Sequence, residues 1–181
     1  MEKISIEKII EIGVQIGVKT ALERIKKEKD EKRKSRYDRR LRNTKLLLRN
    51  YRNLIIHCTD AVNCIKKIST NAIDILDEFE DLDENLYIES ISRSTERTAI
   101  IIAHINKMLQ IYKGMCEASK KPEDIRKYQV IKRIYLDDEG ILAEDLAEEL
   151  KINQRTVYKD IDDAVRTLSA LIFGIDGLNI A

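Results

Sequence analysis

Residues that break helices are scarce in this sequence. It contains one proline and six glycines among 181 residues, whereas 36% of its residues are charged. Proline and glycine are the residues that most disfavour a helix interior, so this composition predicts long helices with few irregular loops. The 43% of hydrophobic residues suffices for a real core, and the length allows one or two small domains.

Other absences exclude whole classes of protein. Cys58, Cys64 and Cys116 are odd in number and lack CxxC spacing, which argues against a disulfide framework and for a reducing cytoplasm. A zinc site made from these cysteines and the two histidines would lack ligand spacing on any one helix. The N-terminus has no signal-peptide pattern, and its longest uncharged run, residues 12–18, is too short to cross a bilayer. No Walker, GxSxG or HExxH motif occurs. We therefore expect a soluble, cytoplasmic protein that is not an enzyme and has no cofactor, metal or membrane span.

Charge is unevenly distributed although the net charge is only +1. Residues 32–52 contain ten basic side chains and one acidic, whereas residues 74–89 contain eight acidic side chains and no basic one. The basic segment could follow a phosphate backbone through Arg39, Arg40 and Arg42. Alternatively, it is a solvated helix face or a counterpart for the acidic stretch in the same molecule or a partner. The acidic stretch lacks the glycine of a calcium loop, so we expect a solvated face there.

The first 36 residues read as one segment in two parts. Residues 4–25 predict a helix rich in Ile and Val, with Gly13, Gly17 and Ala21 at four-residue spacing on one face. This face offers either ordinary tight packing or a homo-oligomer through the N-terminal helices. Residues 26–36 are almost wholly charged and form either a solvated helix or a flexible tether.

Residues 37–118 predict an antiparallel helical hairpin, because two apolar seams with alternating spacings of three and four could face each other. The first seam comprises Tyr37, Leu41, Thr44, Leu48, Tyr51, Ile55, Cys58, Val62 and Ile65. The second comprises Ile88, Ile91, Thr95, Thr98, Ile102, Ile105, Leu109, Tyr112 and Cys116. Between them, Ile73, Leu76 and Phe79 indicate a brief helix. This hairpin would be an interaction domain with coiled-coil packing.

Residues 122–181 predict a compact three-helix domain. Pro122 suits the first position of a helix, Gly140 turns the chain, and Gly174 suits the end of the last helix. The first helix would direct its apolar residues inward, namely Ile125, Tyr128, Ile131 and Tyr135. The remaining two helices would form a helix-turn-helix. Its first helix carries Leu146, Ala147 and Leu150, and its second carries Val157, Ile161, Val165 and Leu168.

The start of the second helix supplies the candidate DNA contacts. Asn153 suits the N-cap, because its side chain can accept a hydrogen bond from the next turn. In a helix-turn-helix the second helix lies in the major groove, with its N-terminal residues nearest the base edges. Those that can donate hydrogen bonds or contact phosphate are Gln154, Arg155, Thr156, Tyr158 and Lys159.

The stretch LAEELKINQRTVYKDI, residues 146–161, resembles the helix-turn-helix of DeoR-like bacterial regulators. It departs from their pattern at Lys151, where glycine is usual, and at Asn153, where serine is usual. The helix before the motif and the long second helix also resemble region four of sigma factors. More widely, YDRRLRNTKLLLRNYRNL and SRSTERTAIIIAHINKML, followed by this motif, resemble the sigma-like regulators of Firmicutes prophages, of the ArpU and RinA type.

We therefore expect an all-α, non-enzymatic regulator: long N-terminal helices that form the hairpin, followed by a helix-turn-helix domain that binds double-stranded DNA. The resemblance implies a bacterial mobile element. The alternative is an interaction protein, either an excision factor that binds a site-specific recombinase or an accessory factor of RNA polymerase.

Overall fold

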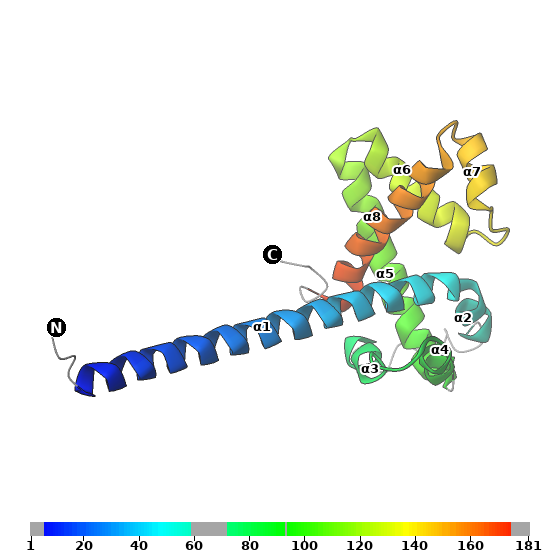
Figure 1. Ribbon diagram of the computed structural model, residues 1–181. Coiled ribbons are helices and arrows are strands. Elements are labelled where there is room, and N and C mark those ends of the chain that lie inside the picture. Colours follow the sequence, from blue (N-terminus) through cyan, green and yellow to red (C-terminus); the bar gives the residue numbers. More distant parts are fainter. Residues whose placement is uncertain (1–5, 59–71, 93, 175–181) are drawn as a thin grey trace. The chain divides into compact units, whose positions relative to one another are not determined.

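The computed structural model describes residues 6–58, 72–92 and 94–174, with side chains from residue 12 onward. In these ranges the regular structure is entirely helical, which confirms the predicted all-α class with its long N-terminal helix and C-terminal helix-turn-helix (Figure 1). The helices are α1 Ile6–Arg49, α2 Tyr51–Cys58, α3 Ala72–Glu78, α4 Glu84–Ser92, α5 Thr95–Ser119, α6 Pro122–Ile131, the π-helical η2 Lys132–Leu136, α7 Ala143–Glu149 and α8 Gln154–Phe173. The chain divides into two compact units, residues 1–36 and 37–181.

The first unit is helical throughout its described length, including the charged residues 26–36. Of the two alternatives for this segment, the solvated helix is therefore correct. Arg24 and Lys27 form ion pairs one turn along the helix, with Glu28 at 3.8 Å and Glu31 at 4.0 Å. The Ile- and Val-rich part before it is at least half exposed at Ile12, Val14, Ile16, Val18, Leu22 and Ile25. Self-association through this helix stays a prediction.

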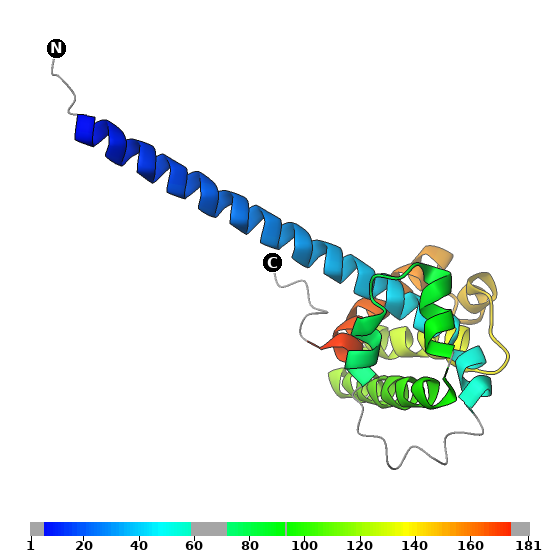
Figure 2. The same ribbon diagram turned by 90° about the horizontal axis from the view of Figure 1, so that it is seen from below.

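The second unit is built around α5, which contacts α2, α3, α4, α6 and α8 (Figures 1 and 2). The two predicted seams meet where α2 packs against α5, and the predicted short helix between them is α3. A continuous coiled coil does not form, because Asn50 separates α1 from α2 and Ser94 caps a new helix at α5. Most seam residues are buried, but Thr95 is exposed. Val62 and Ile65 lie outside the described residues.

The basic segment pairs with the acidic stretch of the same chain, which was the alternative to a DNA-contacting role. The Arg40 side chain is only 2% exposed, and its guanidinium lies 3.1 Å from Asp77 and 3.4 Å from Glu80. Arg39 lies 2.8 Å from Asp81, and Arg42 donates to the Leu82 carbonyl at 2.9 Å. Folding therefore brings these three arginines into ion pairs or hydrogen bonds with the acidic stretch, and their contact with DNA stays a prediction.

The C-terminal helices follow the expected plan with one exception. Pro122 begins α6, and Ile131 is buried while Tyr128 and Tyr135 are half-buried. Ile125, expected to face inward, is 37% exposed, because the next residue, Arg126, faces α8 to pair with an acidic residue there. Since α5 contacts both α6 and α8, the segments predicted as two domains lie in one unit. The domain boundaries stay a prediction.

Candidate nucleic-acid interface

The turn between α7 and α8 has the hydrogen bonds of a Schellman motif. The Ile152 amide donates to the Ala147 carbonyl at 3.0 Å, and the Lys151 amide donates to the Glu148 carbonyl at 3.1 Å. Lys151 occupies the position where this motif favours glycine, and its φ of 55° is left-handed. The sequence departure at Lys151 thus leaves the turn intact, at a backbone cost of roughly 1–2 kcal/mol.

Helix α8 begins at a capped end and is held down by an apolar face. The Asn153 side chain accepts a hydrogen bond from the Arg155 amide at 2.8 Å, which confirms the predicted N-cap. Val157 is fully buried and Ile161 is 7% exposed. Ala147 is buried in α7, and its small side chain lets the two helices approach closely. The burial of Val157 and Ile161 leaves Tyr158 and Lys159, which lie between them, exposed to solvent.

A buried ion pair fixes α8 against α6. The Nε of Arg126 donates to Asp160 at 2.6 Å and its Nη2 donates at 3.3 Å, while Asp160 is only 2% exposed. This hydrogen bonding raises the pKa of Arg126. Sequence reasoning missed the pair, although a signal existed: Asp160 follows Val157 by three residues and therefore shares its buried face. A charged side chain on such a face requires a partner.

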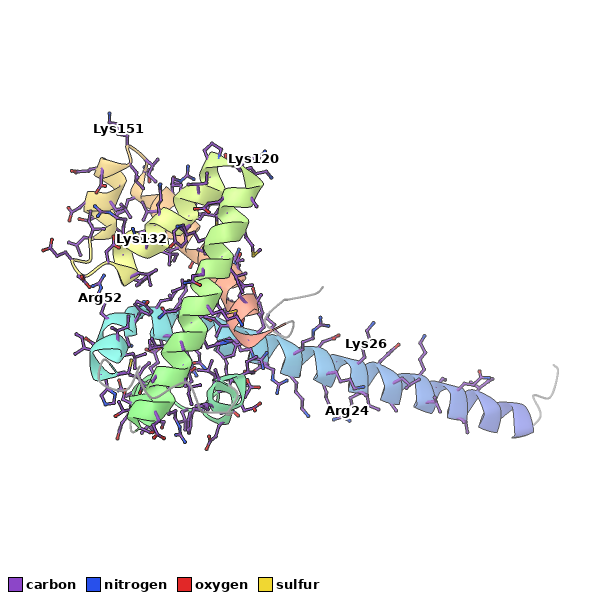
Figure 3. The ribbon with its side chains drawn as sticks, turned by 180° about the vertical axis from the view of Figure 1, so that it is seen from behind. Arg24, Lys26, Arg52, Lys120, Lys132 and Lys151 are labelled. Atoms are coloured by element: carbon purple, nitrogen blue, oxygen red, sulfur yellow. The ribbon has the colours of Figure 1, made fainter. Side chains whose placement is uncertain are left out.

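The predicted contact residues divide into exposed and occupied groups. Arg155 and Lys159 are exposed, and Tyr158 is 53% exposed. Thr156 is half-buried, and Gln154 is half-buried with its side-chain amide donating to Glu144 at 3.1 Å. The structure therefore brings the candidates together on the first turns of α8. Lys151, which was not among the predicted contacts, lies at the tip of the preceding turn and points away from the helices (Figure 3).

The C-terminal segment also matches a known family. Residues 126–177 match the model of a family described as an HTH domain. This segment is a helix-turn-helix domain. No curated protein and no solved structure matches the chain. The match supports a DNA-binding regulator acting through this domain, and proteins of this domain family are typically not enzymes. In the described part of the chain, no helix is long and apolar enough to cross a membrane.

Ion pairing inside the helix-turn-helix domain singles out three cations. Residues 126–177 contain eight basic and eleven acidic side chains, so the domain carries three more negative than positive charges. Five of the basic residues form ion pairs with neighbouring carboxylates, namely Arg126, Lys127, Lys132, Arg133 and Arg166. The other three, Lys151, Arg155 and Lys159, form no ion pair with any described residue. All three lie at the turn or the start of α8.

The cysteines and histidines do not gather into a metal site among the described residues. Cys58 and Cys116 are buried in the core, and burial raises the pKa of both thiols. His104 lies 2.9 Å from the carbonyl oxygen of Ile172, whereas His57 is exposed. Cys64 lies outside the described residues.

Proposed function

We propose that this protein is a transcription regulator that places the first turns of α8 in the major groove of double-stranded DNA. The observation that supports this most directly is the position of Lys151, Arg155 and Lys159. These cations lie on one end of a helix-turn-helix domain whose other basic residues have carboxylate partners. A helix of this type presents its N-terminal residues to base edges, and the phosphates of DNA would supply anionic partners for these three cations.

Each candidate has a distinct proposed role. Arg155, with a planar guanidinium, suits bidentate hydrogen bonding to guanine, whereas Lys159 suits either a base or a phosphate. Lys151, at the tip of the turn, suits a phosphate. Gln154 can contact a base edge, and its Nε2 hydrogen bond to Glu144 competes with that contact. Asn153 holds the cap of α8, and Thr156 and Tyr158 complete the surface.

The charge of the domain predicts how it binds. Three excess negative charges repel the phosphate backbone, so the domain gains little from non-specific attraction. Binding then depends on a few well-placed contacts, and the loss of one of them should be severe. Removing a side chain that makes a bidentate base contact costs about 1–3 kcal/mol, and removing a phosphate contact lowers the salt slope by about 1.

The test starts with selection of a binding site from a random duplex pool by the full-length chain. Affinity for that site and for a scrambled site is then measured by fluorescence anisotropy. Arg155→Ala should weaken binding by about 5-fold to 150-fold and relax sequence preference at one position. Lys107→Ala, which removes an exposed cation from α5, is the matched control and should leave both affinities unchanged.

Two results would contradict the proposal. One is a wild-type chain that selects no sequence from the pool. The other is a selected site whose affinity is insensitive to both Arg155→Ala and Lys159→Ala, because reading would then occur somewhere other than the start of α8.

A second candidate function follows from the exposed apolar side chains of the first unit. Ile12, Ile16 and Leu22 are at least half exposed, and such a surface is commonly covered by a protein partner. This favours the interaction-protein alternative, in which a recombinase or RNA polymerase is the main partner. Binding of the selected site only when such a partner is present would support it. The prophage context is also part of this proposal and rests on the family resemblance.

A further inference from the structure

The charged part of α1 carries one wholly basic side. With 3.6 residues per turn, Lys26, Lys29, Lys32, Arg33 and Arg36 fall within an arc of about 120°. All five are exposed. The carboxylates of this stretch, Glu23, Glu28, Asp30 and Glu31, lie on the rest of the circumference together with Arg24, Lys27 and Lys34. Figure 3 shows Lys26 and Arg24 pointing away from opposite sides of the helix.

The lysines of this basic side have no carboxylate partner among the described residues. Lys26, Lys29 and Lys32 form no ion pair there. The rest of the circumference carries charges of both signs and is called the mixed side; on it, Arg24 and Lys27 pair with Glu28 and Glu31. From Lys26 to Lys32 these three lysines extend about 9 Å along the helix axis, at 1.5 Å per residue. They therefore form a row of exposed cations that has no ion pair among the described residues.

The basic side of α1 supplies what the helix-turn-helix domain lacks. That domain has an excess of three negative charges, and Arg39, Arg40 and Arg42 are occupied by the acidic stretch. We infer that the basic side of α1 binds the phosphate backbone of duplex DNA independently of sequence. Duplex DNA carries one phosphate per about 1.7 Å of its axis when both strands are counted, so a stretch as long as this row of lysines contains roughly five phosphates. This inference rests on the proposed function, because it takes DNA as the ligand.

The order of residues along α1 favours DNA over a lipid surface. A helix that lies in a membrane interface has apolar and basic residues on opposite sides of the same turns. In α1 they follow each other along the same side: Val18, Leu22 and Ile25 precede the basic side and share its arc. Turning the lysines toward phosphates therefore does not require the apolar residues to enter the same surface.

The test compares two variants of the full-length chain with equal loss of charge. Lys26→Gln/Lys29→Gln/Lys32→Gln removes three cations from the basic side, and Arg24→Gln/Lys27→Gln/Lys34→Gln removes three from the mixed side. Glutamine keeps a high helix propensity, so circular dichroism should show the same helix content for both. The probe is a random-sequence duplex of about 30 base pairs, which spans the row of cations several times over. Anisotropy is measured from about 200 to about 50 mM KCl, a range over which phosphate contacts change affinity strongly.

The basic-side variant should lose up to about 2.7 from the salt slope, at about 0.9 per phosphate contact. The ratio of wild-type to variant affinity should then rise about 40-fold between about 200 and about 50 mM KCl. The mixed-side variant should change this ratio less than 4-fold, which corresponds to about one contact or fewer.

The preference for a selected site over the random duplex should be the same in the basic-side variant and the wild type. Equal salt slopes in the wild type and both variants would overturn the inference, even if α8 still reads its site. Equal losses of salt slope in the two variants would show that only the net charge matters, and this result would also overturn the inference. Loss of binding to phosphatidylglycerol vesicles, with DNA binding unaffected, would identify a membrane as the ligand instead. A chain that binds random DNA through α1 but selects no site would leave the inference standing and refute the proposed function.

Discussion

Replacing Lys151 by glycine should make this protein more stable and at the same time weaken its binding to DNA. The residue has a φ of 55°, where a side chain costs roughly 1–2 kcal/mol that glycine avoids. Glycine also loses more backbone entropy on folding, which offsets about 0.5–1 kcal/mol of that gain. The net expectation is an increase of about 0.5–1 kcal/mol in the free energy of unfolding, or a few degrees in melting temperature.

The chain contains a matched control for this backbone effect. Lys120 caps the end of α5 with a φ of 57°, so Lys120→Gly should produce a similar stabilisation. Lys113 lies inside α5, and Lys113→Gly should lower the free energy of unfolding by about 1 kcal/mol. Only Lys151→Gly removes a cation from the proposed DNA surface. It alone should reduce the salt slope for the selected site, by about 1.

Urea unfolding followed by circular dichroism measures the stability of each variant, and anisotropy measures the affinity. A destabilised Lys151→Gly beside a stabilised Lys120→Gly would refute the left-handed turn between α7 and α8. Stabilisation without any change in salt slope would support the left-handed turn but show that Lys151 does not contact DNA.

Three further substitutions test two packing contacts and the pairing of one arginine. Arg126→Met should lower the free energy of unfolding by about 3 kcal/mol because it leaves the Asp160 carboxylate buried without its partner, and adding Asp160→Asn should restore part of the loss in urea unfolding. Gly140→Ala should cost about 1 kcal/mol in the same assay, because a Cβ there would clash with the Arg52 guanidinium and displace it from the carbonyl of Ile134. Arg39→Ala should leave the salt slope for DNA unchanged, since Asp81 already pairs with this guanidinium; a slope reduced by about 1 would return it to the DNA surface.

Much of the helix-turn-helix could be predicted from the sequence because its signals are local. Val157 and Ile161 define a buried face by their spacing alone, and Asn153 caps a helix whose first turn follows it directly. Pro122 and Gly174 mark helix ends for the same reason, since each imposes its own backbone preference. Features of this kind depend on residues within one or two turns of each other.

The charged residues show what could not be predicted in this way. A run of basic residues from Lys32 to Arg52 looks uniform in the sequence, yet Arg40 is buried whereas Lys32 is exposed. The difference arises because α3 and the segment after it bring Asp77 and Glu80 against only one part of the run. The periodicity of a helix shows which residues share a side, but not which side another helix will cover.

The sequence by itself determined the helical class, the turn motif and the residues at the start of α8, because propensity, capping and periodicity act between near neighbours. The tertiary structure decided which charges remain available for a partner. The ion pairs that settle this join residues far apart in the chain: Arg40 lies 37 residues from Asp77, and Arg126 lies 34 residues from Asp160. Charges so distant in sequence meet only when the helices pack, and each such pair engages a cation within the chain.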